Sequence, residues 1–108
     1  MSAKKTDIPY GTLDLLVLKT LDTTGPMHGF GLARRIEQVA GNLLELNQGS
    51  IYPGLLRLQQ RRLIATKWGT SENGRRAKFY SLTTKGKKEL DAEVDSWHRT
   101  TSLVARFL

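Results

Sequence analysis

Ten lysine and arginine side chains fall between residues 47 and 88, a stretch in which Glu72 is the only acidic residue. The bases are Arg57, Arg61, Arg62, Lys67, Arg75, Arg76, Lys78, Lys85, Lys87 and Lys88. Ten bases against one acid give this segment a net charge of +9, whereas the whole chain carries +7. Cationic groups gathered in one segment are typical of proteins that bind phosphate groups. The alternative interpretation is an ordinary solvated charged surface.

The other residues that could do chemistry form no pattern typical of an enzyme. Ser50 has no histidine and acid near it in the sequence to complete a catalytic triad. The glycines of residues 25–31 follow no expected strand, so no phosphate-binding loop is predicted. His28 and His98 are isolated from each other, whereas a zinc site needs several ligands at workable spacing. We therefore expect a protein that is not an enzyme and that needs no metal or other cofactor.

The composition limits the class of protein further. A chain of 108 residues with 39% hydrophobic residues fits one folded domain. It contains no cysteine, which excludes disulfide bonds and thiolate metal sites. No apolar run approaches the roughly 20 residues that a membrane-spanning helix needs, and the N-terminal residues do not resemble a signal peptide. We therefore expect no membrane partner and a cytoplasmic location.

Hydrophobic spacing predicts three helices in the first part of the chain. Residues 1–9 are polar and are expected to form a flexible arm. A helix over residues 12–21 is apolar on most sides and should be deeply buried. A second helix over residues 28–39 has one apolar face, made of Leu32, Ala33, Ile36, Val39 and Ala40. The third helix begins near Ser50, which can cap it, and its buried face consists of Ile51, Leu55 and Leu58.

Two alternating runs then predict a β-hairpin. Residues 63–68 and 77–82 alternate in polarity, and the intervening Asn73-Gly74 is a strong turn signal. Tyr80 is expected to face the core, since it lies on the apolar side of its strand.

A last helix begins at Thr83 or Thr84 and carries an apolar stripe. Its members recur at spacings of four and three: Leu90, Val94, Trp97, Thr101, Val104 and Leu108. Because such stripes pair helices, the expected homodimer interface consists of Leu90, Val94, Trp97, Val104 and Leu108. Trp97 has a second interpretation, since two copies facing each other across a two-fold axis would sandwich a small aromatic effector. Trp68 is expected only to pack within the hairpin.

The order of these elements predicts a mainly α fold with a small β-hairpin, that is, a winged helix-turn-helix followed by a C-terminal dimerisation helix. The winged-helix domain would span residues 10–83 and the dimerisation helix residues 84–108. The third helix would enter the major groove of double-stranded DNA, and the hairpin would lie along the backbone or the minor groove. The residues expected to contact DNA are Gln48, Ser50, Tyr52, Arg57, Arg61, Asn73, Arg75, Arg76 and Lys78.

The chain resembles the PadR-type transcriptional regulators. The resemblance rests on Gly-Ser-Ile-Tyr-Pro-Gly-Leu at residues 49–55, on Arg-Arg-Ala-Lys-Phe-Tyr-Ser-Leu-Thr at residues 75–83, and on Lys85-Gly86. It covers roughly residues 10–90 and fits the short form of the family, which has no long C-terminal domain. It implies a bacterial or archaeal homodimer that binds DNA as a repressor or other regulator. Arg62 departs from the pattern, because the family often has glycine there.

Two other functions remain open from the sequence. A winged-helix domain can serve as a protein-interaction module without binding DNA. Such a module does not need ten bases against one acid in this segment, so the charge favours DNA. RNA binding would favour exposed aromatic side chains on a sheet face, for which Phe79 alone is weak support.

Overall fold

The computed structural model describes residues 11–41, 43–46 and 48–108. This part of the chain contains four helices and a three-stranded antiparallel sheet. In chain order they are α1 (Thr12–Thr24), β1 (Met27–His28), α2 (Gly29–Ala40), α3 (Gln48–Gln60), β2 (Ile64–Thr70), β3 (Arg76–Leu82) and α4 (Thr84–Ala105). The predicted mainly α fold with a hairpin is confirmed. The expected N-terminal arm, residues 1–9, lies outside the described residues.

The hydrophobic core lies where the first three helices pack against one face of the sheet. Its buried side chains are Val17, Leu18, Leu21, Leu32, Ala33, Ile36, Ile51, Leu55, Leu58, Leu63, Ile64, Tyr80 and Leu90. Tyr80 faces the core as predicted, and this burial raises the pKa of its hydroxyl group. Leu13, Leu15 and Leu16 are partly buried against the same core, so α1 contacts it over much of its circumference.

The hairpin joins β2 to β3 through a tight turn at the predicted Asn73-Gly74. Gly74 has a φ of 74°, in the left-handed region that favours glycine. Its N–H donates to the carbonyl of Ser71 at 2.9 Å. The two strands then pair along their whole lengths. We call this hairpin, residues 64–82, the wing.

A third strand was not expected from the sequence. β1 pairs with β3 so that Met27 lies opposite Tyr80 and His28 opposite Phe79. A strand of two residues is too short to show the alternation by which strands are recognised. It ties the start of α2 to the sheet, and His28 then caps α2 because its Nδ1 accepts the N–H of Gly31 at 3.0 Å.

The exit from α3 and the start of α4 are joined by hydrogen bonds. The Thr83 hydroxyl donates to the carbonyls of Arg62 and Leu63 and accepts the N–H of Gly86, all within 3.0 Å. A Cβ atom at Gly86 would lie 2.0 Å from the Leu63 carbonyl oxygen, so this close approach requires glycine. Arg62 has a φ of 62°, a left-handed conformation that is strained for a residue with a Cβ atom. The departure from the family pattern therefore falls on a position whose backbone favours glycine.

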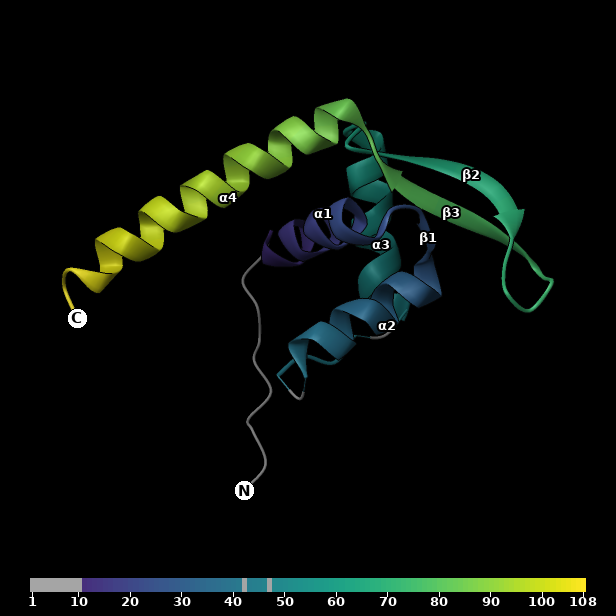
Figure 1. The fold of residues 1–108 in the computed structure, drawn as a ribbon, viewed down its shortest axis with the longest axis horizontal. Coiled ribbons are helices and arrows are strands. Elements are labelled where there is room, and N and C mark those ends of the chain that lie inside the picture. The colour runs from purple at the N-terminus through teal and green to yellow at the C-terminus, as the bar shows by residue number, and fades with distance from the viewer. Residues whose placement is uncertain (1–10, 42, 47) are drawn as a thin grey trace, which may run out of the picture.

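The helix α4 leaves the body of the molecule at the base of the wing and runs away from it (Figure 1). Leu90 is 1% exposed in the core, and Val94 packs partly against that core. The prediction that Leu90 faces a second chain is therefore wrong, because its own chain already covers it. Every residue from 95 to 108 is exposed, so the distal half of α4 is uncovered by the rest of the described chain.

Three further expectations differ from the structure at helix faces or ends. Val39 is 73% exposed, so the buried face of α2 does not include it. The helix α3 begins at Gln48, which places Ser50 inside its first turn rather than at the cap. The helix α4 ends at Ala105, so Leu108, which is 99% exposed, lies beyond the helix that was expected to carry it.

Candidate nucleic-acid interface

One flank of α3 faces the wing and the start of α2. Tyr52 is 40% exposed, and its ring packs so closely on Gly29 that a Cβ atom there would lie 2.7 Å from it. Gln59 donates to the Thr66 hydroxyl of β2 at 3.5 Å. Leu56, one turn after Tyr52, is 55% exposed. Tyr52 is therefore held in place by α2 while part of its surface stays open to solvent.

The first turn of α3 also contains Gln48 and Ser50. Their side chains lie outside the part that the structure describes, so their contacts with bases stay predictions. Both residues lie about one helical turn or less before Tyr52, at the N-terminal end of α3.

The opposite flank of α3 faces α1 and α4. Arg57 lies 3.9 Å from Asp14 of α1, and Arg61 donates to Glu89 of α4 at 3.1 Å. The sequence predicted that both arginines contact DNA phosphates. The structure places a carboxylate beside each of them, so a phosphate has to compete with an ion pair within the chain. Exposed ion pairs contribute only about 0–1 kcal/mol, so this competition would be mild.

The tip of the wing carries the basic residues that the sequence placed on the hairpin. Asn73, Arg75 and Arg76 are exposed there, and Lys78 is half-buried further along β3. Within the described residues, none of these three bases forms an ion pair, in contrast to Arg61. The structure therefore brings the wing residues together but places Arg61 on a different surface.

Trp68 also belongs to this exposed surface, which the sequence did not predict. It packs within the hairpin as expected, but on two cations, and it stays 56% exposed. The Arg76 guanidinium lies 5.0 Å from its ring centroid and the Lys78 ammonium 5.9 Å from it. Cation–π contacts of this length hold the two cations against the ring. Its place directly opposite Lys78 in the strand register was the signal that could have indicated this role.

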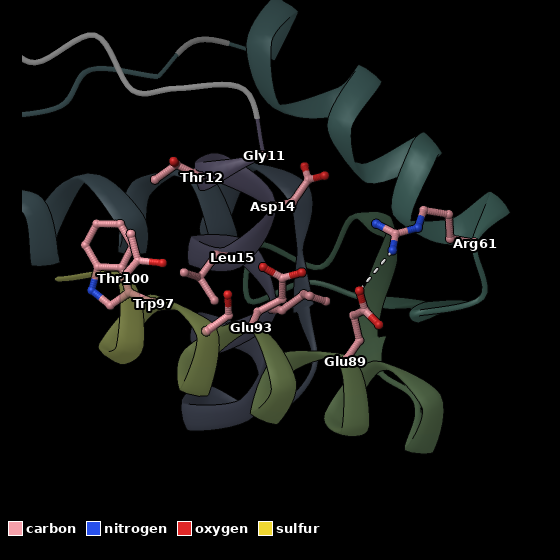
Figure 2. Close-up of a pocket in the computed structure, with 11 residues that line it drawn as sticks. Gly11, Thr12, Asp14, Leu15, Arg61, Glu89, Glu93, Trp97 and Thr100 are labelled. Carbon is pink, nitrogen blue, oxygen red and sulfur yellow. Dashed lines mark hydrogen bonds and ion pairs between the residues drawn. The ribbon is translucent and has the colours of Figure 1, made fainter. Parts of the chain in front are cut away.

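A cavity of about 280 Å³ lies between α1 and α4, away from the wing. Trp97 stands at one end of it and the Arg61–Glu89 ion pair at the other, with Asp14 and Glu93 between them (Figure 2). The lining itself carries three carboxylates and one guanidinium and is therefore acidic, although Arg57 also lies 3.9 Å from Asp14. The structure thus places Trp97, which is 53% exposed, on the wall of a hollow as well as on the apolar stripe of α4.

An exposed ion pair also links α1 to α4. The Lys87 ammonium lies 3.2 Å from the Asp22 carboxylate. This hydrogen bond lowers the pKa of Asp22 and raises the pKa of Lys87. Lys87 is thereby engaged on the α1 side of α4, although it belongs to the basic segment of the sequence.

Two other kinds of feature are absent from the described ranges. Those residues contain no cluster of three or more His, Asp or Glu side chains that could hold a metal ion. None of the helices in them is long and apolar enough to cross a membrane.

The three helices with an attached wing and the exposed basic tip define the class of winged-helix transcriptional regulators. The chain matches the transcriptional regulator PadR-like family over residues 17–92, and it belongs to this family. It is therefore a regulator of transcription and not an enzyme.

Three similar proteins illustrate the range of the family likeness. A PadR family transcription regulator from Clostridium difficile is 27% identical, with a TM-score of 0.77 over 90% of this chain and 98% of that one. Bacillus subtilis PadR, solved in complex with operator DNA, is 24% identical with a TM-score of 0.69, over 81% of this chain and 48% of that one, and shares the fold. An uncharacterized 37.1 kDa protein in transposon TN4556 of Streptomyces fradiae is 37% identical over 83% of this chain, which spans 24% of that protein.

Proposed function

We propose that this protein binds double-stranded DNA sequence-specifically as a homodimer and represses transcription. In this proposal α3 enters the major groove, and the wing lies along the backbone or the adjacent minor groove. The operator is an inverted repeat whose half-sites are about one helical turn apart, or a multiple of it.

The observation that supports DNA binding most strongly is the exposed set of basic side chains on the wing. Arg75 and Arg76 are exposed, and Arg76 and Lys78 are held against the Trp68 ring. Cations that keep a fixed position and form no ion pair in the described chain are available to phosphates. A protein-interaction module gives no reason for this arrangement.

Base recognition would come from the first turns of α3. Tyr52 is held by Gly29, against which its hydroxyl and one ring edge lie, and the rest of its surface that is open to solvent would make the contact with a base. Gln48 and Ser50 are proposed to share this role because they lie about one helical turn or less before it. Each good base contact discriminates by about 1–3 kcal/mol.

The dimer would form through the exposed half of α4. Trp97 and Val104 of the predicted stripe are joined there by Leu103, which the stripe did not include, and the exposed Phe107 follows just beyond the end of the helix. Burying a large apolar side chain stabilises by about 1.5–3 kcal/mol. Several such side chains from each of two chains can offset an association cost of about 4–15 kcal/mol.

A small aromatic effector is proposed to bind against Trp97. The cavity beside Trp97 has a volume of about 280 Å³ and lies between α1 and α4. Its carboxylates Asp14, Glu89 and Glu93 favour a flat compound that also carries a positive charge. Such a ligand would reach the Arg61–Glu89 pair at the far end of the cavity.

DNA binding is tested with a duplex that the protein selects from a random-sequence library. The wild type should bind it more tightly than a scrambled duplex, and binding should weaken steeply with salt because counterions are released. Tyr52→Phe and Gln48→Ala should weaken specific binding more than non-specific binding. Equal losses on both duplexes would limit these residues to backbone contacts. Failure to select or bind any duplex at low salt would favour the interaction module.

The effector proposal is tested by tryptophan fluorescence. The chain contains two tryptophans, so Trp68→Phe leaves Trp97 as the only reporter. Planar aromatic cations should quench its emission at saturable concentrations, and Glu93→Gln in the same background should weaken that quenching. A flat response to a broad set of such compounds would leave Trp97 as an interface residue only.

A further inference from the structure

A second basic surface lies between α2 and the wing, outside the residues that the sequence assigned to DNA contact. A groove of about 550 Å³ separates the two elements. Arg34 and Arg35 of α2 line one side, Arg75 and Arg76 of the wing line the other, and Glu72 is its only acidic residue. The start of α2 and the wing lie on the same side of the molecule (Figure 1).

The four arginines of this groove differ from Arg61 and Arg99 in having no carboxylate partner in the described chain. Within residues 11–41, 43–46 and 48–108 none of the four forms an ion pair. Arg61 and Arg99, in contrast, are paired with Glu89 and Asp95. Like charges gathered around one hollow repel each other when they have no counterion. This groove therefore has the electrostatics of a site for a polyanion.

The groove also offers neutral donors and an ordered guanidinium. The Arg34 guanidinium lies 5.7 Å from the centroid of the Phe30 ring, which holds it against α2. The side chains of Gln38 and Asn73 line the groove beside the arginines. In protein–DNA complexes, both amide and guanidinium N–H groups donate hydrogen bonds to phosphate oxygens.

We propose that this groove holds the phosphate strand of duplex DNA that runs between the major and minor grooves, so that Arg34 and Arg35 make α2 a third DNA-contacting element. This inference rests on the proposed DNA-binding function. A winged helix that inserts α3 into the major groove and its wing into the adjacent minor groove straddles one such strand. Arg75 and Arg76 belong to both the wing tip and the groove, so the two surfaces are continuous.

The first test compares salt dependence in two variants that lose the same charge. Arg34→Ala with Arg35→Ala removes two exposed arginines, so folding should be retained. The control, Lys19→Ala with Arg106→Ala, removes two exposed bases from α1 and from the end of α4. In the groove variant, the slope of log K against log salt should fall by about 0.9 for each phosphate that is no longer neutralised. We expect affinity to drop on the order of tenfold or more in the groove variant and much less in the control.

A second test locates the contact on the DNA. Single phosphates of the selected duplex are replaced by neutral methylphosphonates, one at a time. The wild type should lose affinity at the phosphates of the strand between the two grooves. The Arg34→Ala, Arg35→Ala variant should be insensitive at one or two of those positions and retain the wild-type sensitivity elsewhere. Arg34→Lys with Arg35→Lys should restore part of the lost sensitivity. The lysines keep the positive charge but lack the planar guanidinium that donates two parallel hydrogen bonds.

The outcomes separate this inference from the function on which it rests. If the wild type binds DNA and the groove variant matches the control in slope and in methylphosphonate profile, the groove does not hold a DNA strand. If both proteins bind DNA equally, but tripolyphosphate stabilises only the wild type and not the groove variant against heat, the groove binds a free polyphosphate instead. If the wild type binds no duplex, the proposed function itself fails and the inference fails with it.

Discussion

Two hollows in the described part of the chain carry opposite charge. The groove between α2 and the wing is lined by four arginines and one glutamate, whereas the cavity between α1 and α4 is lined by three carboxylates and one arginine. In the described chain the groove arginines form no ion pairs, while Arg61 at the cavity is paired with Glu89. The total charge of +7 therefore describes neither surface. What decides whether a base is available to a phosphate is the placement of the few acids.

This separation would suit different partners on the two sides, in line with the proposed function. A surface rich in carboxylates repels the phosphates of DNA, so the proposed DNA contact would fall on the groove and the wing. The side that carries α4 combines those carboxylates with exposed apolar residues, which suits contact with protein or a small ligand. Five changes test this division, in order of decreasing expected effect.

Breaking the apolar end of α4 should have the largest effect. Leu103→Asp with Val104→Asp places two charges in the proposed dimer interface without touching Val94, which packs partly on the chain's own core. We expect a folded monomer and a loss of operator affinity on the order of a hundredfold or more, because two half-sites are no longer bound together. Sedimentation and gel shifts measure the two effects. Ser102→Asp is the control on the same helix, and a double variant that remains dimeric would place the interface elsewhere.

Removing the two arginines at the wing tip should have the next largest effect. Arg75→Ala with Arg76→Ala should weaken binding to all duplexes by about tenfold to a hundredfold, because charge-assisted hydrogen bonds to phosphates are removed. Gel shifts over a series of salt concentrations should show a slope smaller by about 0.9 for each phosphate that the variant no longer neutralises. A selective loss on the operator alone would instead indicate that the tip reads bases.

A backbone change between the two sides should alter stability. Arg62→Gly relieves a left-handed residue and should raise the free energy of unfolding by about 0.5–1 kcal/mol, after the entropy that glycine gains in the unfolded chain is subtracted. Urea unfolding measures this change. Arg62→Ala removes the same charge and keeps the strain, so it should not stabilise. Equal effects of the two variants would show that charge, and not backbone strain, matters at this position.

Removing the aromatic platform of the wing should have a smaller effect. Trp68→Ala releases Arg76 and Lys78, whose cation–π contacts contribute about 0.5–1 kcal/mol each at exposed sites. We expect DNA affinity to fall by about threefold, and Trp68→Phe to restore most of it, in a fluorescence anisotropy titration. A loss that phenylalanine does not reduce would assign the indole itself a direct contact with DNA.

The smallest expected effect is a gain in DNA affinity from a change in the acidic cavity between α1 and α4. Glu89→Gln removes the partner of Arg61, which then becomes available to a phosphate. Because an exposed ion pair contributes about 0–1 kcal/mol, DNA affinity should rise by only about twofold. Glu93→Gln is the matched control, since it removes the same charge from the same cavity without touching that ion pair. An equal gain from both variants would mean that the charge of the cavity acts at long range.

Much of the fold followed from local patterns in the sequence. The wing was predicted from the alternation of its strands and from the Asn73-Gly74 turn signal. That signal is reliable here because the turn needs the left-handed φ that Gly74 adopts. Tyr80 was placed in the core by the same alternation. The strand β1 was missed because two residues are too few to show a period. Val39 was misplaced because its spacing fits the apolar face of α2, but no other part of the described chain covers it there.

The sequence itself determined three features: the positive charge of residues 47–88, the wing, and the apolar stripe of the last helix. Each of them depends on residues close together in the chain. The tertiary structure alone decided which of those residues remain available. Arg61 meets Glu89, which lies 28 positions further along, and Leu90 is covered by its own core. Arg34 and Arg35, from a segment that is neutral in the sequence, line the same groove as the wing. Such pairings depend on how elements distant in sequence pack together. The spacing of residues within one segment gives no information about that packing.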